Sequence, residues 1–420
     1  MAERGAEFDV VMLGGDIGVY ALARAFHEAF GVRSTVISRT VAGPVADSSI
    51  VINEPVGGEG TEEQLLARLV KVAEEKKRES PQTPLIALAN ADWLIKLLSD
   101  HRDELSQWYV LPILSADVLE SVSDKTEFTH TCERLAIPTP GTITIDFRPV
   151  HRADGTPPAI PEFDFDYPVV AKTSRSSAYA HVEFEGKRKV FKIESRAELE
   201  DLVRKLDDAG YTDRFVVQEM IPGDDTAMRS ITAYVDATGT VTMLGGAHVL
   251  LEEHTPGALG NPAAMFTTDL GQLYDHALAF LEESGYRGFA NFDVKVDPRD
   301  GVGKFFEVNP RIGRNNYYMT AAGINVAEVV VADAVRRQHI PLRRLTTEVL
   351  YSVVPKPLLW RYITDPKLKA RVKAIGKKAT VHPLAYEVEG LGRKKYVALA
   401  MINQVKKFLT YYPKPSTTGF

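Results

Sequence analysis

Several side chains with oxygen atoms gather in one predicted hairpin, residues 289–311, which reads FANFDVKVDPRDGVGKFFEVNPR. Two strand-like runs flank a turn rich in Asp, Pro and Gly, and successive side chains of a strand point to opposite faces. Glu307 and Asn309 therefore share a face, and folding the hairpin places Asp293 opposite them, with Arg311 just beyond. Magnesium in proteins takes few carboxylates and completes its shell with phosphate oxygens. The hairpin predicts a metal–nucleotide phosphate site; the alternative is an acidic surface hairpin without a ligand.

Other residues along the chain have types that suit the remaining parts of ATP. Lys125 begins a predicted helix, and Lys172 ends an apolar strand, where an ammonium group can meet phosphate oxygens as a point charge. The strand end Gln218-Glu219-Met220-Ile221 can hydrogen-bond the adenine edge through its backbone, while the methionine covers the ring. After the turn at Gly223, Asp224 or Asp225 can receive the ribose hydroxyls.

Composition limits the class of protein. A length of 420 residues favours two to three domains, and 45% hydrophobic with 25% charged residues is typical of a soluble globular protein. The single cysteine, Cys132, excludes an internal disulfide framework and fits a reducing compartment. The N-terminus lacks the basic and apolar regions of a signal peptide, and no run of 18 apolar residues occurs. We therefore expect a cytoplasmic protein without a membrane span.

The first 115 residues form a predicted α/β domain. The expected strands are 8–16, 34–38 and 84–89, and the expected helices are 19–30 and 92–98. Gly14, Gly15 and Gly18 do not match the dinucleotide pattern G-x-G-x-x-G, and Arg39 stands where that pattern needs an acid. NAD binding is therefore disfavoured, and the glycines instead predict a tight turn and a helix N-terminus that receives a small anion.

The middle of the chain predicts an α+β substructure of two lobes, residues 116–215 and 216–350. Its expected helices are 124–135, 196–209 and 268–283, and its expected strands are 167–172, 182–184 with 189–193, 215–220, and 230–235 with 241–244. A proline-marked junction then leads into a C-terminal segment, residues 351–420, with two basic helices near 365–376 and 394–409. The whole chain is thus predicted to combine an α/β domain with an α+β fold.

The order of these features resembles the ATP-grasp superfamily over residues 8–335, with FFEVNPR as its most specific piece. The resemblance implies an N-terminal domain before two lobes that clasp ATP and Mg²⁺, or Mn²⁺ in its place. It implies phosphate lysines at 125 and 172, an adenine site at 219 and 221, a ribose site at 224 or 225, metal ligands at 293, 307 and 309, and an arginine on the phosphorylated intermediate at 311. The sequence departs from the family pattern in a Ser-rich loop at 173–178 and in aspartate after Gly223 and at position 293.

Three further stretches, NPRIGRNNYYMTAAGINVAE, MRSITAYVD and LLEEHTPGALGN, look like the D-aspartate ligase subgroup. That resemblance implies a carboxylate–amine ligase that forms an acylphosphate, then an amide with the lysine amine of a peptidoglycan precursor. Arg229, Arg311 and Arg314 would hold carboxylates by bidentate pairing. The loop 257–261 would close over the site and exclude water.

Two other functions fit the same constellation: an ATP-dependent carboxylating enzyme and a nucleotide sensor without turnover. The implied partners are a small carboxylic acid and an amine; the oligomeric state stays open, with a dimer as one option. His248 and His254 are expected to be packed or loop histidines.

Charge is unevenly distributed. The net charge is −6, yet residues from Ser352 onward carry 14 Lys and Arg against three Asp and Glu, a net of +11 that leaves −17 for the rest. Aromatic residues are not interleaved with these cations, which argues against a nucleic-acid reader. In the helix near 394–409, the residues Val397, Met401, Val405 and Leu409 share a face that we expect to pack on the body. The lysines would then attract an anionic precursor or contact a membrane surface peripherally.

Overall fold

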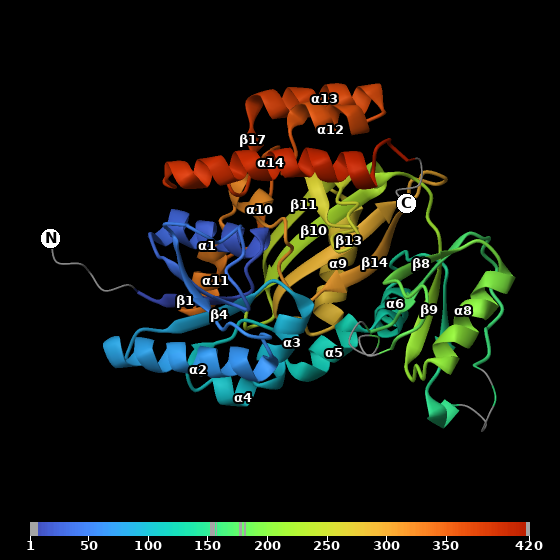
Figure 1. Cartoon of the computed structure of the whole chain (residues 1–420), viewed down its shortest axis with the longest axis horizontal. Coiled ribbons are helices and arrows are strands. Elements are labelled where there is room, and N and C mark those ends of the chain that lie inside the picture. The colour runs from blue at the N-terminus through green and yellow to red at the C-terminus, as the bar shows by residue number, and fades with distance from the viewer. Residues whose placement is uncertain (1–6, 152–155, 157, 176–178, 180–181, 417–420) are drawn as a thin grey trace.

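The computed structural model describes residues 7–151, 156, 158–175, 179 and 182–416, and these form three β-sheets surrounded by helices (Figure 1). Residues 176–178 of the predicted Ser-rich loop lie outside the described residues. The division into 1–115, 116–215, 216–350 and 351–420 stays a prediction, and the sheets are described below without it.

The first sheet is parallel, with strand order β3-β2-β1-β4-β5. Its strands are β1 (Asp9–Leu13), β2 (Ser34–Ser38), β3 (Val51–Pro55), β4 (Leu85–Ala89) and β5 (Tyr109–Val110). Its helices are α1 (Ile17–Phe30), α2 (Glu62–Glu79), α3 (Asp92–Asp100) and α4 (Arg102–Leu105). The strand order reverses between β1 and β4, and such a reversal opens a crevice at the carboxyl ends of the strands. The predicted α/β unit is present, but its elements β3, β5, α2 and α4 were not among those predicted.

The second sheet is small and antiparallel, with strand order β6-β9-β7-β8. Its strands are β6 (Thr142–Asp146), β7 (Val169–Thr173), β8 (Val190–Ile193) and β9 (Arg214–Glu219), and α8 (Arg196–Asp208) packs beside it. The helices α5 (Ala116–Ser123) and α6 (Lys125–Arg134) precede it, with a 3-10 turn at Pro149–His151. The expected strand at 182–184 is wrong: Phe184 stacks on Phe191 with ring centroids 6.3 Å apart, so this segment packs by its side chains instead of pairing.

The third sheet has the order β14-β13-β10-β11-β12-β16-β17, with β15 beside β11. Its strands are β10 (Met228–Val235), β11 (Val241–Glu252), β12 (Pro262–Thr267), β13 (Gly288–Val296), β14 (Gly303–Asn309), β15 (Arg343–Arg344), β16 (Leu350–Ser352) and β17 (Thr380–Val381). Its helices are α9 (Gln272–Glu283), α10 (Tyr317–Ala321) and α11 (Val326–Ala334), and a 3-10 turn covers Asp225–Ala227. Helix α9 begins later than predicted because the amide of Thr268 bonds Gly246 of the sheet and Asp269 forms a turn onto Gly271.

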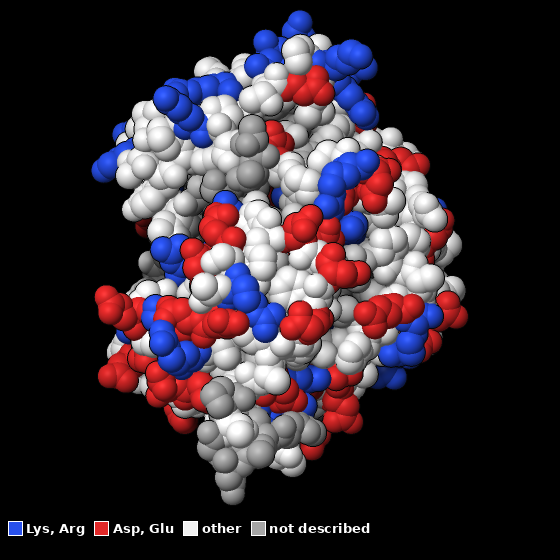
Figure 2. All heavy atoms as spheres, turned by 90° about the vertical axis from the view of Figure 1, so that its right-hand side faces the viewer, with Lys and Arg blue, Asp and Glu red and all other residues white. Residues whose placement is uncertain are grey.

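The C-terminal helices are α12 (Lys356–Tyr362), α13 (Pro366–Lys378) and α14 (Leu391–Tyr411). They lie together at one end of the molecule (Figure 1), and Lys and Arg gather at that end (Figure 2). Helix α14 packs through Val397 and Phe408, whereas Leu409 is 51% exposed, so its predicted place on the packed face is wrong. The helical period explains the error, because Arg393 lies on the buried face and donates to the carbonyls of Gly43, Pro44 and Ala46.

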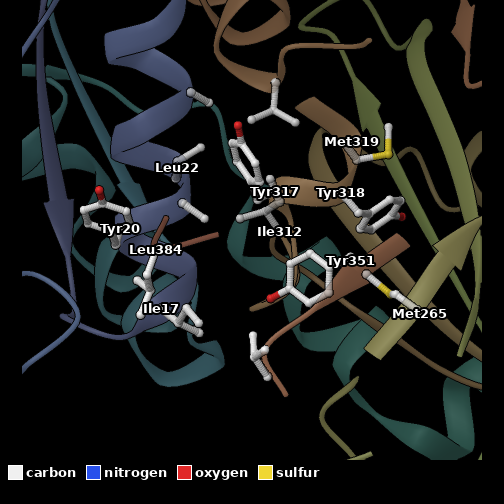
Figure 3. Packing of buried hydrophobic residues seen from close by; sticks show 14 of the residues in the cluster. Ile17, Tyr20, Leu22, Met265, Ile312, Tyr317, Tyr318, Met319, Tyr351 and Leu384 are labelled. Carbon is white, nitrogen blue, oxygen red and sulfur yellow. The ribbon is translucent and has the colours of Figure 1, made fainter. Parts of the chain in front are cut away.

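One hydrophobic cluster joins α1, the third sheet and the C-terminal segment. Figure 3 shows Ile17 and Tyr20 of α1 on one side, Tyr317 and Tyr318 of α10 in the middle, and Met265 of β12 beyond them. The second sheet has a separate cluster of its own, centred on Phe215 and α8. None of the described helices is long and apolar enough to cross a membrane.

Candidate active site

The predicted hairpin forms from β13 and β14, and it brings the expected oxygen ligands together. Asp293 pairs with Glu307 and Asn291 with Asn309 across the two strands. The amide nitrogen of Asn309 donates to Oδ2 of Asp293 at 3.0 Å, so these two side chains touch. A register shift directly after Asp293 interrupts the ladder, and such bulges re-aim side chains. The sequence prediction of one oxygen-rich patch therefore agrees with the geometry.

Both predicted phosphate lysines reach this hairpin. Nζ of Lys125, at the start of α6, lies 3.5 Å from Oε2 of Glu307. Lys172, on β7, points its Nζ over the ring of Phe306 at 5.8 Å. Burial lowers the pKa of Lys172 to about 8, although the charge of Glu307 opposes the shift. A positive pair thus faces the carboxylates from the second sheet and its preceding helix.

The two hairpin carboxylates respond oppositely to their surroundings. Burial raises the pKa of Asp293, and the neighbouring charge of Glu307 raises it further. Burial would also raise the pKa of Glu307, but the charges of Lys125 and Lys172 outweigh it, so this pKa is lowered. Two half-buried carboxylates that face each other repel, and a divalent cation between them relieves that repulsion.

These donors fit a magnesium ion that is shared with phosphate. Among the described residues, no group of three or more His, Cys, Asp and Glu could enclose a metal on its own. Mg²⁺ is held in nucleotide enzymes by one or two carboxylates plus substrate phosphates, which matches Asp293 and Glu307. Oδ1 of Asn309 already accepts a hydrogen bond from Nη2 of Arg311 at 3.1 Å. If Asn309 is the third metal ligand, this oxygen is shared between the metal and Arg311.

Two arginines after the hairpin reach the crevice of the first sheet. Nε of Arg311 donates to Asp92 at 2.9 Å, and Nε of Arg314 lies 3.3 Å from Oδ2 of Asp16. Asp16 follows β1 and Asp92 follows β4, so both acids lie where the strand order reverses. Neither acid was among the predicted site residues. The rule that loops after parallel strands carry functional residues would have singled them out.

The helix N-terminus after the glycine turn, which was predicted to receive a small anion, is capped by a carboxylate of the chain itself. Oδ1 of Asp16 accepts from the amides of Gly18 and Val19, which caps α1 with the chain's own carboxylate. Gly18 is required for another reason: an added Cβ would lie 2.8 Å from Cα of Arg314 and closer still to the side-chain amide of Asn90. The glycine therefore permits the close approach of the arginine loop.

The residues predicted to line the adenine site make side-chain contacts within the protein. The side chain of Glu219 accepts from Lys304 at 3.3 Å and from Arg299, and the amide of Gln218 donates to Thr142 at 3.1 Å. The Ile221 side chain is buried and Met220 half-buried. These contacts hold the end of strand β9 in place. The backbone contacts of this strand end with adenine stay a prediction.

The two aspartates after Gly223 point to different surroundings. Asp225 is buried, and its Oδ2 accepts from the amide of Glu252 and contacts Nε2 of His254 at 3.0 Å. Asp224 is half-buried and forms a turn onto Thr226. Of the two, Asp224 is thus the candidate for the ribose hydroxyls.

Arg229, the third predicted catalytic arginine, lies opposite Val294 of the hairpin. Its Nη1 donates to the carbonyls of Thr226 and Met228, and burial lowers its pKa to about 10. It faces His248 across β10 and β11, and burial lowers the pKa of that histidine to about 3. Both histidines singled out in the sequence pack as expected, His254 stacking on Tyr412 at 3.5 Å between ring centroids.

No family model matches the chain. The curated D-aspartate ligase of Enterococcus faecium (strain Aus0004) is 31% identical to it over 413 residues, which are 97% of this chain and 97% of the relative. The chain belongs to the D-aspartate ligase family. Family membership confirms the predicted class, an ATP-dependent carboxylate–amine ligase that forms a carbon–nitrogen bond.

Solved structures share the fold at lower identity. The L-amino acid ligase from Bacillus licheniformis matches 79% of this chain and 75% of its own, with TM-score 0.53 and 15% identity. The biotin carboxylase domain of Hydrogenobacter thermophilus 2-oxoglutarate carboxylase matches 82% and 74%, with TM-score 0.58 and 15% identity. N5-carboxyaminoimidazole ribonucleotide synthetase from Thermus thermophilus matches 81% of each chain, with TM-score 0.53 and 17% identity. The predicted ATP-grasp fold is thereby confirmed.

The lowered pKa of Lys172 predicts how ATP affinity depends on pH. Below about 8 the ammonium is charged and attracts phosphate, and above that value the charge is lost. We expect ATP affinity to fall by up to about tenfold per pH unit above about 8. The fall should level off above the pKa of the ATP-bound lysine, which the phosphates raise. Calorimetric titration with Mg-ATP across this range measures the effect. In the Lys172→Arg control, which stays charged, the profile should be flat; the same profile in both proteins would contradict the assignment.

Proposed function

We propose that this ligase activates the side-chain carboxylate of D-aspartate with Mg-ATP and joins it to an amine of a peptidoglycan precursor. The observation that supports this most is the convergence at the β13–β14 hairpin. There, two carboxylates and two lysines meet Arg311, which in turn contacts the crevice of the first sheet. The family relative supplies the choice of acid.

In the first step, an oxygen of the acid attacks the γ-phosphorus of ATP, and the bond from phosphorus to the ADP oxygen breaks. Lys125 and Lys172 hold the phosphate oxygens, and Arg311 lies against the transferred group through its free donors. Phosphoryl transfer needs mostly positioning and charge stabilisation, which these cations supply. Magnesium, when bound by Asp293, Glu307 and Asn309, neutralises charge on the phosphates.

In the second step, the amine attacks the acyl carbon of the acylphosphate. The carbon–nitrogen bond forms, inorganic phosphate leaves, and the nitrogen releases a proton. The acylphosphate must be shielded from water during this step. The proposed cover is the loop 257–261. Asn261 of this loop lines the same pocket as Arg314 and Asn315, which supports the proposal.

The proposal is tested by phosphate release over a panel of D- and L-amino acids, first with hydroxylamine to trap the acylphosphate and then with a peptidoglycan precursor peptide. We expect D-aspartate to give the highest rate and its hydroxamate to accumulate. L-aspartate should be at least about tenfold slower, because a site built for one arrangement of polar groups leaves them unpaired with the other. A higher rate with another acid would replace D-aspartate as the substrate. No phosphate release with any acid would contradict the ligase function.

A further inference from the structure

A buried carboxylate beside the proposed site has no cationic partner among the described residues. Glu253 directly follows β11 and is 1% exposed. Its Oε1 accepts from the side-chain amide of Gln404 on α14 at 2.7 Å, but its Oε2 has no hydrogen-bond partner among the described residues. Oε1 of Gln404 is likewise buried and unpaired in the described part of the chain. Two acceptors therefore share one pocket and lack a donor.

Such an arrangement is costly unless a donor joins it. An isolated buried carboxylate is strongly disfavoured, and buried charges in proteins are normally paired. Within the described residues, no Lys, Arg or His nitrogen lies within ion-pair distance of Glu253, although the chain carries many such pairs elsewhere. The group that completes this pocket must bring positive charge or several donors.

The same pocket carries an arginine. Arg314 lines it together with Ile17, Asn315 and Tyr351. Figure 3 shows the hydroxyl of Tyr351 directed toward the side where Ile17 of α1 lies. The partner of Arg314, Asp16, already accepts hydrogen bonds from two backbone amides and Asn90. A guanidinium has five donors, so Arg314 can donate to a second carboxylate as well.

We propose that this pocket binds the ammonium and α-carboxylate groups of the amino-acid substrate, with Glu253 and Gln404 receiving the ammonium and Arg314 the α-carboxylate. The inference rests on the proposed function and adds how the acid is selected. Arg314 and Arg311 lie three residues apart in one loop, and Arg311 follows the hairpin directly. A substrate whose α-carboxylate is bound by Arg314 would therefore extend its second carboxylate toward Arg311 and the hairpin. An α-amino dicarboxylic acid fits this arrangement, and α14 becomes part of the substrate site through Gln404.

The test compares each acid with its analogue that lacks the ammonium, here D-aspartate and succinate. Phosphate release is measured for the unmodified protein, Glu253→Gln and Gln404→Leu. We expect Glu253→Gln to raise the KM for D-aspartate by about ten- to a hundredfold, the usual effect of losing a hydrogen bond to a charged group. The KM for succinate and that for ATP should change less than about twofold. Gln404→Leu should shift the aspartate value in the same direction by about tenfold or less.

Controls separate this role from a structural one. Glu348→Gln removes an exposed carboxylate that pairs with Arg371, and Asn403→Ala changes the exposed neighbour of Gln404, so neither should alter the KM ratio of D-aspartate to succinate. The unfolding temperature of Glu253→Gln should equal or exceed that of the unmodified protein, because an unpaired buried charge is removed. If the amino-acid panel identifies another acid as the substrate, that acid and its analogue without the ammonium group are compared in place of D-aspartate and succinate.

An unchanged KM ratio in Glu253→Gln would overturn the inference and leave a structural water as the partner of the two acceptors. A marked fall in unfolding temperature would overturn it as well, since it would assign Glu253 to the fold. Both results are distinct from failure of the ligase function, which is decided by phosphate release from the unmodified protein. Calorimetric titration of D-aspartate and succinate without ATP gives a second readout, in which only D-aspartate binding should weaken in the variant.

Discussion

Replacing Glu307 with Gln is expected to abolish ATP-dependent phosphate release while the fold survives. The change keeps the side-chain shape but removes the carboxylate nearest to Lys125, at 3.5 Å, and opposite Asp293. Without it, the metal site retains a single carboxylate, and the two phosphate lysines lose their counter-charge. We expect kcat to fall by at least about a thousandfold, the upper end for losing one preorganised electrostatic group.

The fold should tolerate this substitution, because removing one of two facing carboxylates relieves repulsion with Asp293. Unfolding temperature and Mg-ATP titration distinguish the two effects: the first should change little, and metal-dependent ATP affinity should fall. Asp300→Asn, at the far turn of the same hairpin and exposed, is the matched control and should keep full activity. Normal turnover in Glu307→Gln would contradict the assignment of Glu307 as a metal ligand.

Arg311→Ala is expected to give the second largest loss. Its Nε, Nη2 and Nη1 donate to Asp92 at 2.9 Å, to Asn309 at 3.1 Å and to the carbonyl of Ile312 at 3.4 Å. Because a guanidinium has five N–H donors, others are left for the transferred phosphoryl group. Removal of one preorganised donor to developing charge typically lowers kcat by about a hundred- to a thousandfold. The KM for ATP should change far less, because the lysines still bind the phosphates. Pre-steady-state phosphate release and hydroxamate formation measure which step is slowed.

Asp92→Asn serves as the comparison, since it weakens the orienting ion pair but leaves Arg311 on Asn309. A loss of about tenfold or less is expected there, in line with a partly exposed ion pair. If Asp92→Asn and Arg311→Ala were equally impaired, the arginine would act only by tying the hairpin loop to the first sheet. Equal activity of Arg311→Ala and the unmodified protein would remove Arg311 from the chemistry.

The hairpin could be predicted from the sequence because its evidence is local. Strand alternation fixes which faces Glu307 and Asn309 share, and the turn fixes what lies opposite. Lys125 and Lys172 were identified only through the order of the family motifs, since an isolated lysine is normally a solvated charge. The roles assigned to these residues stay predictions.

The contacts that could not be predicted from the sequence join residues that are far apart in the chain and meet only through packing. Nothing near Asp16 in the sequence shows that it contacts Arg314, about three hundred residues later. The same holds for Asp92 and Arg311, about two hundred residues apart. Arg393 lies in a lysine-rich helix that predicts solvent exposure, yet backbone carbonyls of residues 43–46 make its burial favourable. The pairing of Glu253 with Gln404 likewise exists only once α14 has docked.

The buried contact between the C-terminal segment and the first sheet has a mechanical consequence. Glu389 accepts from Tyr20, Ser48 and Ser49 of the first sheet's surroundings, and Arg393 binds beside it, so α14 braces that sheet against the third. The second sheet keeps its own hydrophobic cluster and meets the hairpin through ion pairs such as those of Glu219 with Lys304 and Arg299. A nucleotide bound at the hairpin would therefore lie between a braced body and a sheet that is held to it by polar contacts, so movement of that sheet would need to break ion pairs and not a shared hydrophobic core.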